Sequence, residues 1–395
     1  MSEIKSLKRD SELESLLHSE QKLTIEKMAV GGSGIGRLQF KDKSLVVFVP
    51  YAAPEDQLTV KISKVEKNFL IAEIIRIDLP SSMRTSPECE YFGQCGGCLW
   101  QHLKIDEQIN QKELILRDLF KKFLPDTDIQ LQPTIQTKNI YSYRNRIQLK
   151  QMGQTVGYFK HESHDIVPIK NCLIAEKPLQ TLIETFSSKV KPSRELKKWE
   201  LKVAQNNQAE YYPVGQRGEG IAFSQVNRFV NELLVSHVVT TTQKLKPQNI
   251  TELYAGAGNF TFAIAQSLPK SLIQAVELGS GLTANAVEQV KSLKLHKQIS
   301  FFTTSCENFC NSAQTISSEF VLLDPPRSGC HEDVIKRLAH EQPKHILYIS
   351  CHPVSLVRDI KPLMERYSIA HLQIFDMFPQ TDHFETVCLL KLKES

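Results

Sequence analysis

Apolar and polar residues alternate along the first eighty residues of the chain. Short runs of this kind are separated by turn-forming stretches such as "GGSGIG" at 31–36, and they read "LTIEKM", "SLVVFVPY", "DQLTVKISKV" and "FLIAEIIRI". A period of two is typical of half-buried strands, and about five short strands joined by glycine-rich turns favour a small barrel. We therefore predict a polar lead-in over 1–21 and an OB-like β-barrel over 22–78, a fold that often binds nucleic acid.

From residue 216 onward, apolar runs alternate with longer amphipathic stretches. The segment "NITELYAGAGNFTFAIAQSL" indicates a strand, a glycine-rich turn and a helix, and further apolar runs follow as "SLIQAVELG", "ISFFTTS", "EFVLLDPP", "HILYISC" and "LQIFDMF". Strands that alternate with helices are typical of a parallel, doubly wound sheet, so we predict a Rossmann-like α/β domain over 216–395. The intervening residues 79–215, with a helical period at 104–124 and shorter strands, are expected to form a central α+β domain.

Composition is that of a globular protein that stays in water. The chain has 395 residues, of which 41% are hydrophobic and 23% charged. No apolar run approaches the ~20 residues that span a bilayer, and the polar amino-terminal stretch lacks the apolar centre of a secretory signal. We therefore expect a cytoplasmic protein with no membrane association and no evident obligate protein partner.

Positive charge gathers in the central domain, although the net charge is only +4. Arg144 and Arg146 flank Asn145, and a lysine-rich stretch surrounds Trp199. The cations of that stretch are Lys189, Lys191, Arg194, Lys197, Lys198 and Lys202. Such a cluster neutralises phosphates in nucleic-acid-binding proteins, and it is equally consistent with a solvated surface.

The first strand of the α/β domain ends in a turn that suits an adenosyl cofactor. Gly256 and Gly258 let the backbone approach a ligand at the start of a helix. A dinucleotide fold has a third glycine three positions on, where Thr261 stands instead. Glu277 ends the next strand, the position from which an acidic residue binds a ribose diol. This combination favours S-adenosylmethionine over a dinucleotide.

Two further strands end in residues that can do chemistry. Asp324 follows "VLL" and precedes two prolines, and Cys351 follows "HILYIS". Because the carboxyl ends of parallel strands meet at one edge of a sheet, we expect both side chains in one crevice. A cysteine at a strand end is more often a small buried hydrophobe. A thiolate, however, is suited to adding to C6 of a pyrimidine, which makes C5 nucleophilic toward a sulfonium methyl group.

Such a reaction needs a base that removes the proton left on C5. Glu385 in "TDHFETVCLL" is our candidate, because partial desolvation raises the pKa of a carboxyl toward the working range. The alternative is an ordinary surface carboxylate at the start of a strand.

Five segments together resemble the RNA (uracil-5-)-methyltransferase family. They are "FSQVN" at 223–227, "ELYAGAGNFTF", "LLDPPRSG", "YISCHPVSL" and "TDHFETV", in the order found in that family. The resemblance implies that Cys351 is the nucleophile, that Glu385 is the base and that Phe223 lies near the flipped base. It also implies cofactor binding by Gln225, Tyr254, Asn259, Glu277 and Asp324. Where the family holds the cofactor adenine with Asn or Asp, this chain has "TTSCENF", and we predict Ser305 as the substitute.

Four cysteines form a candidate metal site. Cys89, Cys95 and Cys98 have the spacing C-x5-C-x2-C, and Cys172 is a distant fourth. Four thiolates suit structural zinc or an iron–sulfur cluster, and a three-plus-one arrangement favours [4Fe–4S]. The resembled family has members with this pattern and a [4Fe–4S] cluster, and we expect a structural cluster here.

The leading hypothesis is an S-adenosylmethionine-dependent enzyme that methylates C5 of a uridine flipped out of structured RNA. A TRAM (OB-like) barrel with an iron–sulfur site resembles the branch that acts on 23S ribosomal RNA more than the bacterial transfer-RNA branch, with Arg144 and Arg146 contacting the RNA. The alternatives are the same reaction on transfer RNA, methylation of cytosine C5, and a non-catalytic RNA-binding protein. The cytosine class typically has a proline–cysteine pair in the D-P-P region, where Arg327 and Ser328 stand here.

Overall fold

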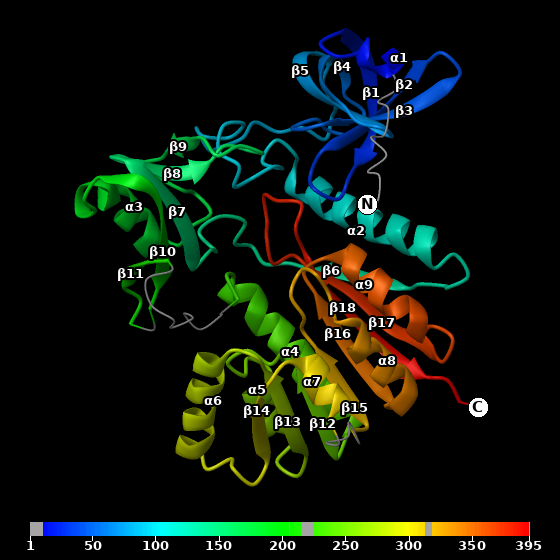
Figure 1. Ribbon diagram of the computed structural model, residues 1–395, viewed down its shortest axis with the longest axis vertical. Coiled ribbons are helices and arrows are strands. Elements are labelled where there is room, and N and C mark those ends of the chain that lie inside the picture. Colours follow the sequence, from blue (N-terminus) through cyan, green and yellow to red (C-terminus); the bar gives the residue numbers. More distant parts are fainter. Residues whose placement is uncertain (1–10, 205, 215–224, 313–317, 395) are drawn as a thin grey trace, which may run out of the picture. The chain divides into compact units, whose positions relative to one another are not determined.

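The computed structural model describes residues 11–204, 206–214, 225–312 and 318–394. The chain divides into two compact units, each built from segments that are distant in sequence (Figure 1). The first contains Met1–Ile115, Thr155–Ile169 and Pro379–Asp382, and the second contains Leu116–Gln154, Lys170–Phe378 and His383–Ser395.

The first unit begins with a closed five-stranded barrel, as the alternating pattern predicts. Its strands are β1 (Glu20–Met28), β2 (Gly34–Phe40), β3 (Lys43–Val49), β4 (Gln57–Val65) and β5 (Phe69–Leu79), in the order β1-β2-β3-β5-β4. The core starts before β1, because Leu13 and Leu16, in and just after the short helix α1 (Ser11–Glu14), are buried against the barrel interior. Burial of each such side chain contributes roughly 1.5–3 kcal/mol.

A buried ion pair joins the barrel to the segment that follows it. The carboxylate of Asp56, fully buried, accepts hydrogen bonds from Nε and Nη2 of Arg84 at 2.6–3.0 Å and from the backbone N–H groups of Ala53 and Ser81. Satisfying every lone pair in this way offsets the cost of burying the charge. The same unit contains the hairpin β8 (Thr155–Phe159) and β9 (Ile166–Pro168) and the first half of α2 (Ile105–Phe123).

The second unit is built on an eight-stranded, mainly parallel sheet. Its strands, in spatial order, are β14 (Ile299–Thr303), β13 (Leu272–Glu277), β12 (Asn249–Leu253), β15 (Phe320–Leu323), β16 (His345–Ser350), β18 (Glu385–Leu392), β17 (Tyr367–Phe375) and β6 (Leu131–Ile135). The order reverses at β12, and β18 is antiparallel to both of its neighbours. The predicted doubly wound fold is confirmed.

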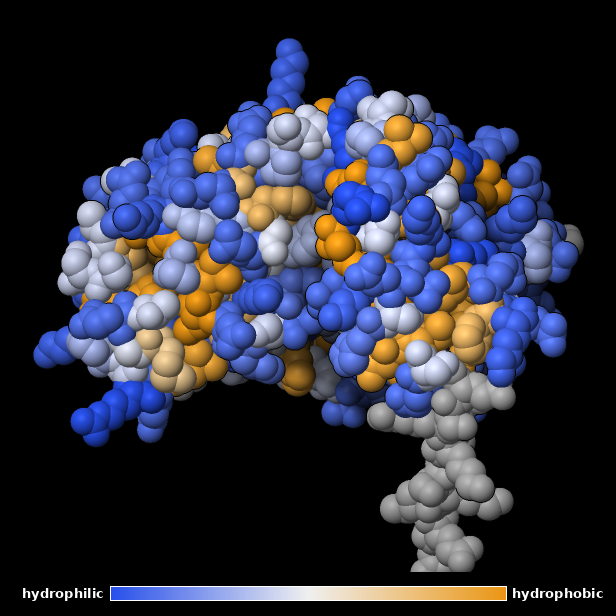
Figure 2. All heavy atoms as spheres, turned by 90° about the horizontal axis from the view of Figure 1, so that it is seen from above, coloured by the Kyte–Doolittle hydropathy of each residue, from blue (hydrophilic) through white to orange (hydrophobic). Residues whose placement is uncertain are grey.

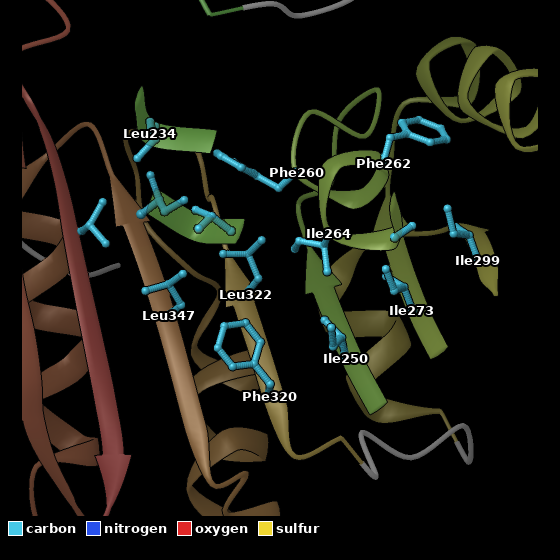
Figure 3. Close-up of a cluster of buried hydrophobic side chains, with 14 of the residues drawn as sticks. Leu234, Ile250, Phe260, Phe262, Ile264, Ile273, Ile299, Phe320, Leu322 and Leu347 are labelled. Atoms are coloured by element: carbon cyan, nitrogen blue, oxygen red, sulfur yellow. The ribbon is translucent and has the colours of Figure 1, made fainter. Parts of the chain in front are cut away.

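Helices cover this sheet and bury its apolar residues. They are α4 (Arg228–Leu245), α5 (Thr261–Ser267), α6 (Ser280–Ser292), α7 (Cys306–Asn311), α8 (Glu332–Glu341), α9 (Pro353–Ile360) and the 3-10 turn η1 (Lys361–Leu363). In Figure 3, Leu234 of α4 and Phe260 beside α5 point toward Leu322 and Leu347 of the central strands. This packing holds the carboxyl ends of the strands in place.

A smaller antiparallel sheet in the second unit contains β7 (Arg146–Gly153), β10 (Ser193–Val203) and β11 (Ala209–Pro213). Helix α3 (Lys177–Lys189) packs on one face, where the rings of Phe186, Trp199 and Tyr211 lie 5.2–6.0 Å apart, centre to centre. That apolar contact leaves the other face of the sheet to polar side chains.

Hydrophilic residues cover much of the face drawn in Figure 2. None of the helices in the described part of the chain is long and apolar enough to cross a membrane.

Candidate active site

One cavity of about 1060 Å³ lies at the carboxyl ends of the parallel strands in the second unit. The residues singled out from the sequence that line it are Gln225, Tyr254, Gly256, Asn259, Glu277, Ser305, Asp324, Cys351 and Glu385. Doubly wound sheets bind their ligands in this place, where the strand order reverses. The cavity therefore brings together residues that are up to 240 positions apart in the chain, from Asn145 to Glu385.

The glycine-rich turn after β12 forms one wall of the cavity. Gly258 has a φ of +89°, and a Cβ atom there would lie 2.6 Å from Cε2 of Phe262. The carboxylate of Glu277 secures this turn, because it accepts hydrogen bonds from the N–H of Gly256 at 3.0 Å and from the N–H of Gly279 at 2.7 Å. Each oxygen keeps a second lone pair, which is what a ribose diol requires.

A buried acid beneath the turn was not found from the sequence. Glu252 on β12 is almost fully buried and accepts a hydrogen bond of 2.5 Å from Oγ1 of Thr261, the residue that replaces the third glycine. Burial raises the pKa of Glu252 to about 8. The available signal was an acidic residue inside the apolar run "NITELY". Thr261 therefore ties the start of α5 to the strand.

Polar groups on α4 and α7 complete the cofactor side. Asn259 exchanges two amide hydrogen bonds with Asn231 of α4, at 3.0 and 3.1 Å. Ser305 caps α7, and its Oγ accepts from the N–H of Asn308 at 3.3 Å, so the hydroxyl is partly engaged within the helix. The neighbouring buried Cys306 also lines the cavity.

Cys351 and Glu385 are brought together by the pairing of β16 with β18. Ser350, the last residue of β16, pairs with Thr386 in this antiparallel register, so Cys351, the residue after the strand, faces Glu385. Both side chains line the same cavity, as the predicted chemistry requires. Glu385 is only 3% exposed, and its Oε2 has no hydrogen-bond partner within the described residues. An unpaired buried carboxylate oxygen that borders a cavity is suited to taking a proton from a ligand.

Burial and neighbouring negative charges raise the pKa values at this end of the cavity. Burial, followed by the negative charge of Asp324, raises the pKa of Glu385 well above its usual range. Burial also raises the pKa of Asp324 to about 7. The pKa of the Cys351 thiol rises to about 12, through burial first and then through the carboxylates of Glu385 and Asp324, while Arg327 opposes the rise. Burial and mutual repulsion therefore favour the neutral forms of the Cys351 thiol and of the Asp324 and Glu385 carboxyls.

The loop after Asp324 is held by side chains of α9. Oδ2 of Asp359 accepts from the N–H of Cys330 and from the hydroxyl of Tyr348, both at 2.7 Å. Oγ of Ser355 donates to the carbonyl oxygen of Arg327 at 2.8 Å. Gly329, with a φ of +83°, lies so close to Asp359 that a Cβ atom would be 2.4 Å from its carboxylate. Helix α9 begins two residues after Cys351, so one helix adjoins both the loop after Asp324 and the end of β16.

The predicted cofactor residue Gln225 and the predicted RNA contacts Arg144, Arg146 and Phe223 differ in their relation to the cavity. Gln225 is buried in the cavity wall, and its carbonyl oxygen accepts from Nδ2 of Asn145 at 3.1 Å. Asn145 itself lines the cavity, a role that the sequence did not indicate, whereas its neighbours Arg144 and Arg146 are not among the lining residues in the described part of the chain. Phe223 lies outside the described residues.

The four candidate metal cysteines fall in both units. Cys89, Cys95 and Cys98 belong to the first unit and Cys172 to the second, and all four are partly exposed. Among the described residues, no group of three or more His, Cys, Asp or Glu side chains is arranged to hold a metal ion. Because the four cysteines fall in both units, the iron–sulfur site stays a prediction.

Comparison with known proteins matches two families along the chain. The model for the tRNA (Uracil-5-)-methyltransferase family matches residues 200–393, and the model for the TRAM domain matches residues 14–75. An uncharacterized RNA methyltransferase of Bdellovibrio bacteriovorus is 38% identical over 389 residues, which cover 95% of this chain and 96% of the relative.

More distant relatives have more specific names. A 23S rRNA (uracil(1939)-C(5))-methyltransferase of Shewanella baltica is 27% identical, with 95% of this chain and 96% of the relative covered. The crystal structure of a Pyrococcus abyssi tRNA (uracil-54, C5)-methyltransferase in complex with S-adenosyl-L-homocysteine superposes with a TM-score of 0.69. It is 21% identical and covers 93% of this chain and 99% of that structure. At that identity the superposition establishes the fold.

Proposed function

We propose that this chain, which belongs to the RNA (uracil-5-)-methyltransferase family, transfers a methyl group from S-adenosylmethionine to C5 of a uridine in 23S ribosomal RNA. The observation that carries the proposed mechanism is the meeting of Cys351 and Glu385 in the cavity that also contains Glu277 and the glycine-rich turn. A nucleophile, a buried base and a nucleoside-binding acid are the three groups that this reaction requires.

The cofactor side of the cavity fits S-adenosylmethionine, which supplies a methyl group on a positively charged sulfur. Glu277 presents two carboxylate lone pairs for the ribose hydroxyls, beside the close backbone approach at Gly256 and Gly258. The remaining proposed contacts come from Gln225, Tyr254, Asn259, Ser305 and Asp324. A carboxylate such as Asp324 near a cationic sulfur is stabilised by the opposite charge.

The covalent steps follow from the position of Cys351 and Glu385. The thiol of Cys351 loses its proton, and a carboxyl with a pKa near 7, as at Asp324, is able to accept it. The sulfur then forms a bond to C6 of the uracil, and the electron pair of the C5–C6 double bond moves to C5. C5 takes the methyl group as the bond between that group and the sulfonium sulfur breaks, and S-adenosylhomocysteine is the leaving group. Glu385 finally removes the proton from C5, the C5–C6 double bond re-forms, and the bond between sulfur and C6 breaks.

Ribosomal RNA is the substrate that we favour over transfer RNA. The barrel and the four cysteines occur together here, and the ribosomal relative of Shewanella baltica covers nearly all of the chain. On the RNA side we assign contacts to Arg144, Arg146 and Phe223. Nucleoside mass spectrometry of ribosomal and transfer RNA, from cells with and without the protein, tests this choice, because 5-methyluridine must disappear from one of them.

The [4Fe–4S] cluster is the second part of the proposal. Cys89, Cys95, Cys98 and Cys172 supply the four thiolates that such a cluster needs, and no step of the methyl transfer involves it. Iron and sulfide analysis of protein purified without oxygen, with Cys98→Ser as the comparison, tests the assignment. Four irons per chain in the wild-type protein and a loss in the variant are expected, whereas bound zinc or no metal would contradict it.

The active-site assignment has a paired test. We expect Cys351→Ala to abolish transfer of labelled methyl groups while S-adenosylmethionine still binds. Glu385→Gln is expected to accumulate a covalent RNA adduct that survives denaturing electrophoresis, because methylation proceeds and proton removal does not. Turnover by the alanine variant, or an adduct-free glutamine variant, would remove the respective residue from its role. Absence of methyl transfer by the wild-type protein would favour the non-catalytic RNA-binding alternative.

A further inference from the structure

The small sheet of the second unit has a polar face that the methyl transfer does not use. In the antiparallel register of β7 and β10, Lys150 is opposite Lys198 and Arg146 is opposite Lys202. Side chains alternate between the two faces of a strand, so these four cations share one face. Trp199, Leu149, Ile147 and Leu201 occupy the opposite face, where α3 packs. We call Arg146, Lys150, Lys198 and Lys202 the cationic strip.

Like charges opposite one another destabilise a sheet, and this face has two such pairs, with Gln148 and Glu200 between them. The pKa of Lys150 is lowered, first by burial and then by the ammonium group of Lys198. The same face also has two carboxylates, Glu200 and Glu210, and Nζ of Lys202 lies 3.9 Å from Glu210. Four cations against two carboxylates leave an excess of positive charge that folding alone does not explain.

The strip begins at the wall of the catalytic cavity. Arg146, the first residue of β7, directly follows Asn145, which lines the cavity and donates to the carbonyl oxygen of Gln225. Each residue of a strand advances about 3.3 Å, so Lys150 lies roughly 13 Å farther along β7. A row of cations of this length, starting beside a residue of the cavity wall, suits the phosphates of the nucleotides next to a base bound in the cavity.

An exposed tyrosine lies beside the cationic strip. Tyr212 of β11 pairs with Glu200 and is exposed, and Nζ of Lys202 lies 5.2 Å from the centre of its ring. An exposed ring among cations offers a base a stacking surface, as in proteins that bind single-stranded nucleic acid. A purely acidic protein partner would have no use for this ring, so the combination favours RNA.

We infer that the cationic strip binds the phosphodiester backbone of the RNA next to the target uridine and so guides that base into the cavity. This inference rests on the proposed function, because it takes RNA as the substrate, and it adds Lys150, Lys198 and Lys202 to the binding surface. The contacts are to phosphate, so they contribute affinity and register rather than sequence preference.

The test compares two double variants that remove the same charge. Lys150→Gln with Lys198→Gln removes one opposed pair of the strip, and Lys189→Gln with Lys191→Gln removes two exposed lysines of the same sequence cluster that lie outside it. The probe is ribosomal RNA purified from cells that lack the protein. RNA affinity is measured at several salt concentrations, together with binding of S-adenosylmethionine and thermal unfolding.

The strip variant is expected to bind RNA at least about tenfold more weakly at low salt. Its plot of log affinity against log salt should be shallower by roughly 1.4–1.8, the value for two lost phosphate contacts. Its cofactor affinity should be unchanged, and its melting temperature equal or higher, because a like-charge pair is gone. The control should match the wild-type protein. Equal salt slopes for the strip variant and the wild type, or an equal loss in the control, would overturn the inference.

Failure of the proposed function has a different signature. If the wild-type protein transfers no methyl group to any RNA, the function proposed above is wrong, whatever the two double variants do. If the wild-type protein methylates RNA and the strip variant has an unchanged KM for RNA and an unchanged salt slope, only the strip assignment is wrong.

Discussion

The neighbours of Cys351 predict that its thiol is unreactive until the site is filled. Burial and the carboxylates of Glu385 and Asp324 raise the pKa of this thiol to about 12. An ordinary cysteine has a pKa of about 8.5, so at pH 8 Cys351 has on the order of a thousandfold less thiolate than an exposed cysteine. Only the thiolate is alkylated, and the rate of alkylation should fall in proportion.

The perturbation is Glu385→Gln, which removes the larger of the two carboxylate contributions and preserves the shape of the side chain. We expect Cys351 to react faster with iodoacetamide in this variant, because its thiolate is no longer opposed by that charge. The rate should remain below that of an exposed cysteine, since burial is the first cause of the raised pKa and is unchanged. Asp324→Asn should act in the same direction with a smaller effect.

The assay measures the alkylation of each cysteine peptide by mass spectrometry between pH 7 and pH 10. A short peptide with one cysteine, added to the same sample, serves as the exposed reference thiol. Alkylation of wild-type Cys351 as fast as that of the reference, or slower alkylation in the Glu385→Gln variant, would contradict this prediction. Added S-adenosylmethionine, whose sulfonium is positive, is expected to accelerate the wild-type reaction toward the rate of the variant.

Three further predictions concern the scaffold of the site. Gly258→Ala should weaken cofactor binding and cost roughly 1–3 kcal/mol of stability, measured by calorimetry and denaturant unfolding, because a Cβ atom at a φ of +89° meets Phe262. Burial raises the pKa of Glu252 to about 8, so this carboxyl binds its proton more tightly in the folded chain than in the unfolded chain. The resulting contribution to the free energy of unfolding is complete below about pH 4 and is lost as the pH rises through about 8. The free energy of unfolding of Glu252→Gln should therefore fall less between pH 5 and pH 8 than that of the wild-type protein, and equal slopes would contradict this. Asp56→Ala should destabilise the first unit by about 3–5 kcal/mol, seen as a lower denaturant midpoint for barrel fluorescence or circular dichroism, because it leaves Arg84 without its buried partner.

Much of the site could be predicted from residues at the ends of apolar runs. Glu277, Asp324 and Cys351 each follow a run that the structure shows as a strand. Parallel strands connected by helices bring their carboxyl ends to one edge, so sequence order alone was enough to place these three near one another. Alternation of apolar and polar residues was likewise sufficient for the barrel.

Other members of the site depend on contacts that no local pattern encodes. Glu252 was missed because an acid within an apolar run is recognisable only once Thr261 is seen to be its partner. Asn145 reaches the cavity through hydrogen bonds with a segment 80 positions away. Neither pairing leaves a periodic signal in the sequence.

Local periodicity and turn residues are enough to show which chemical groups this protein has and at which strand ends they stand. The opposition of Glu385 and Cys351 depends instead on long-range pairing, because β18 enters the sheet antiparallel to β16 with Thr386 opposite Ser350. A shift of one residue in that register would turn the carboxylate to the other face of the sheet. The side-chain packing on both faces, which sets the register, is a property of the whole fold.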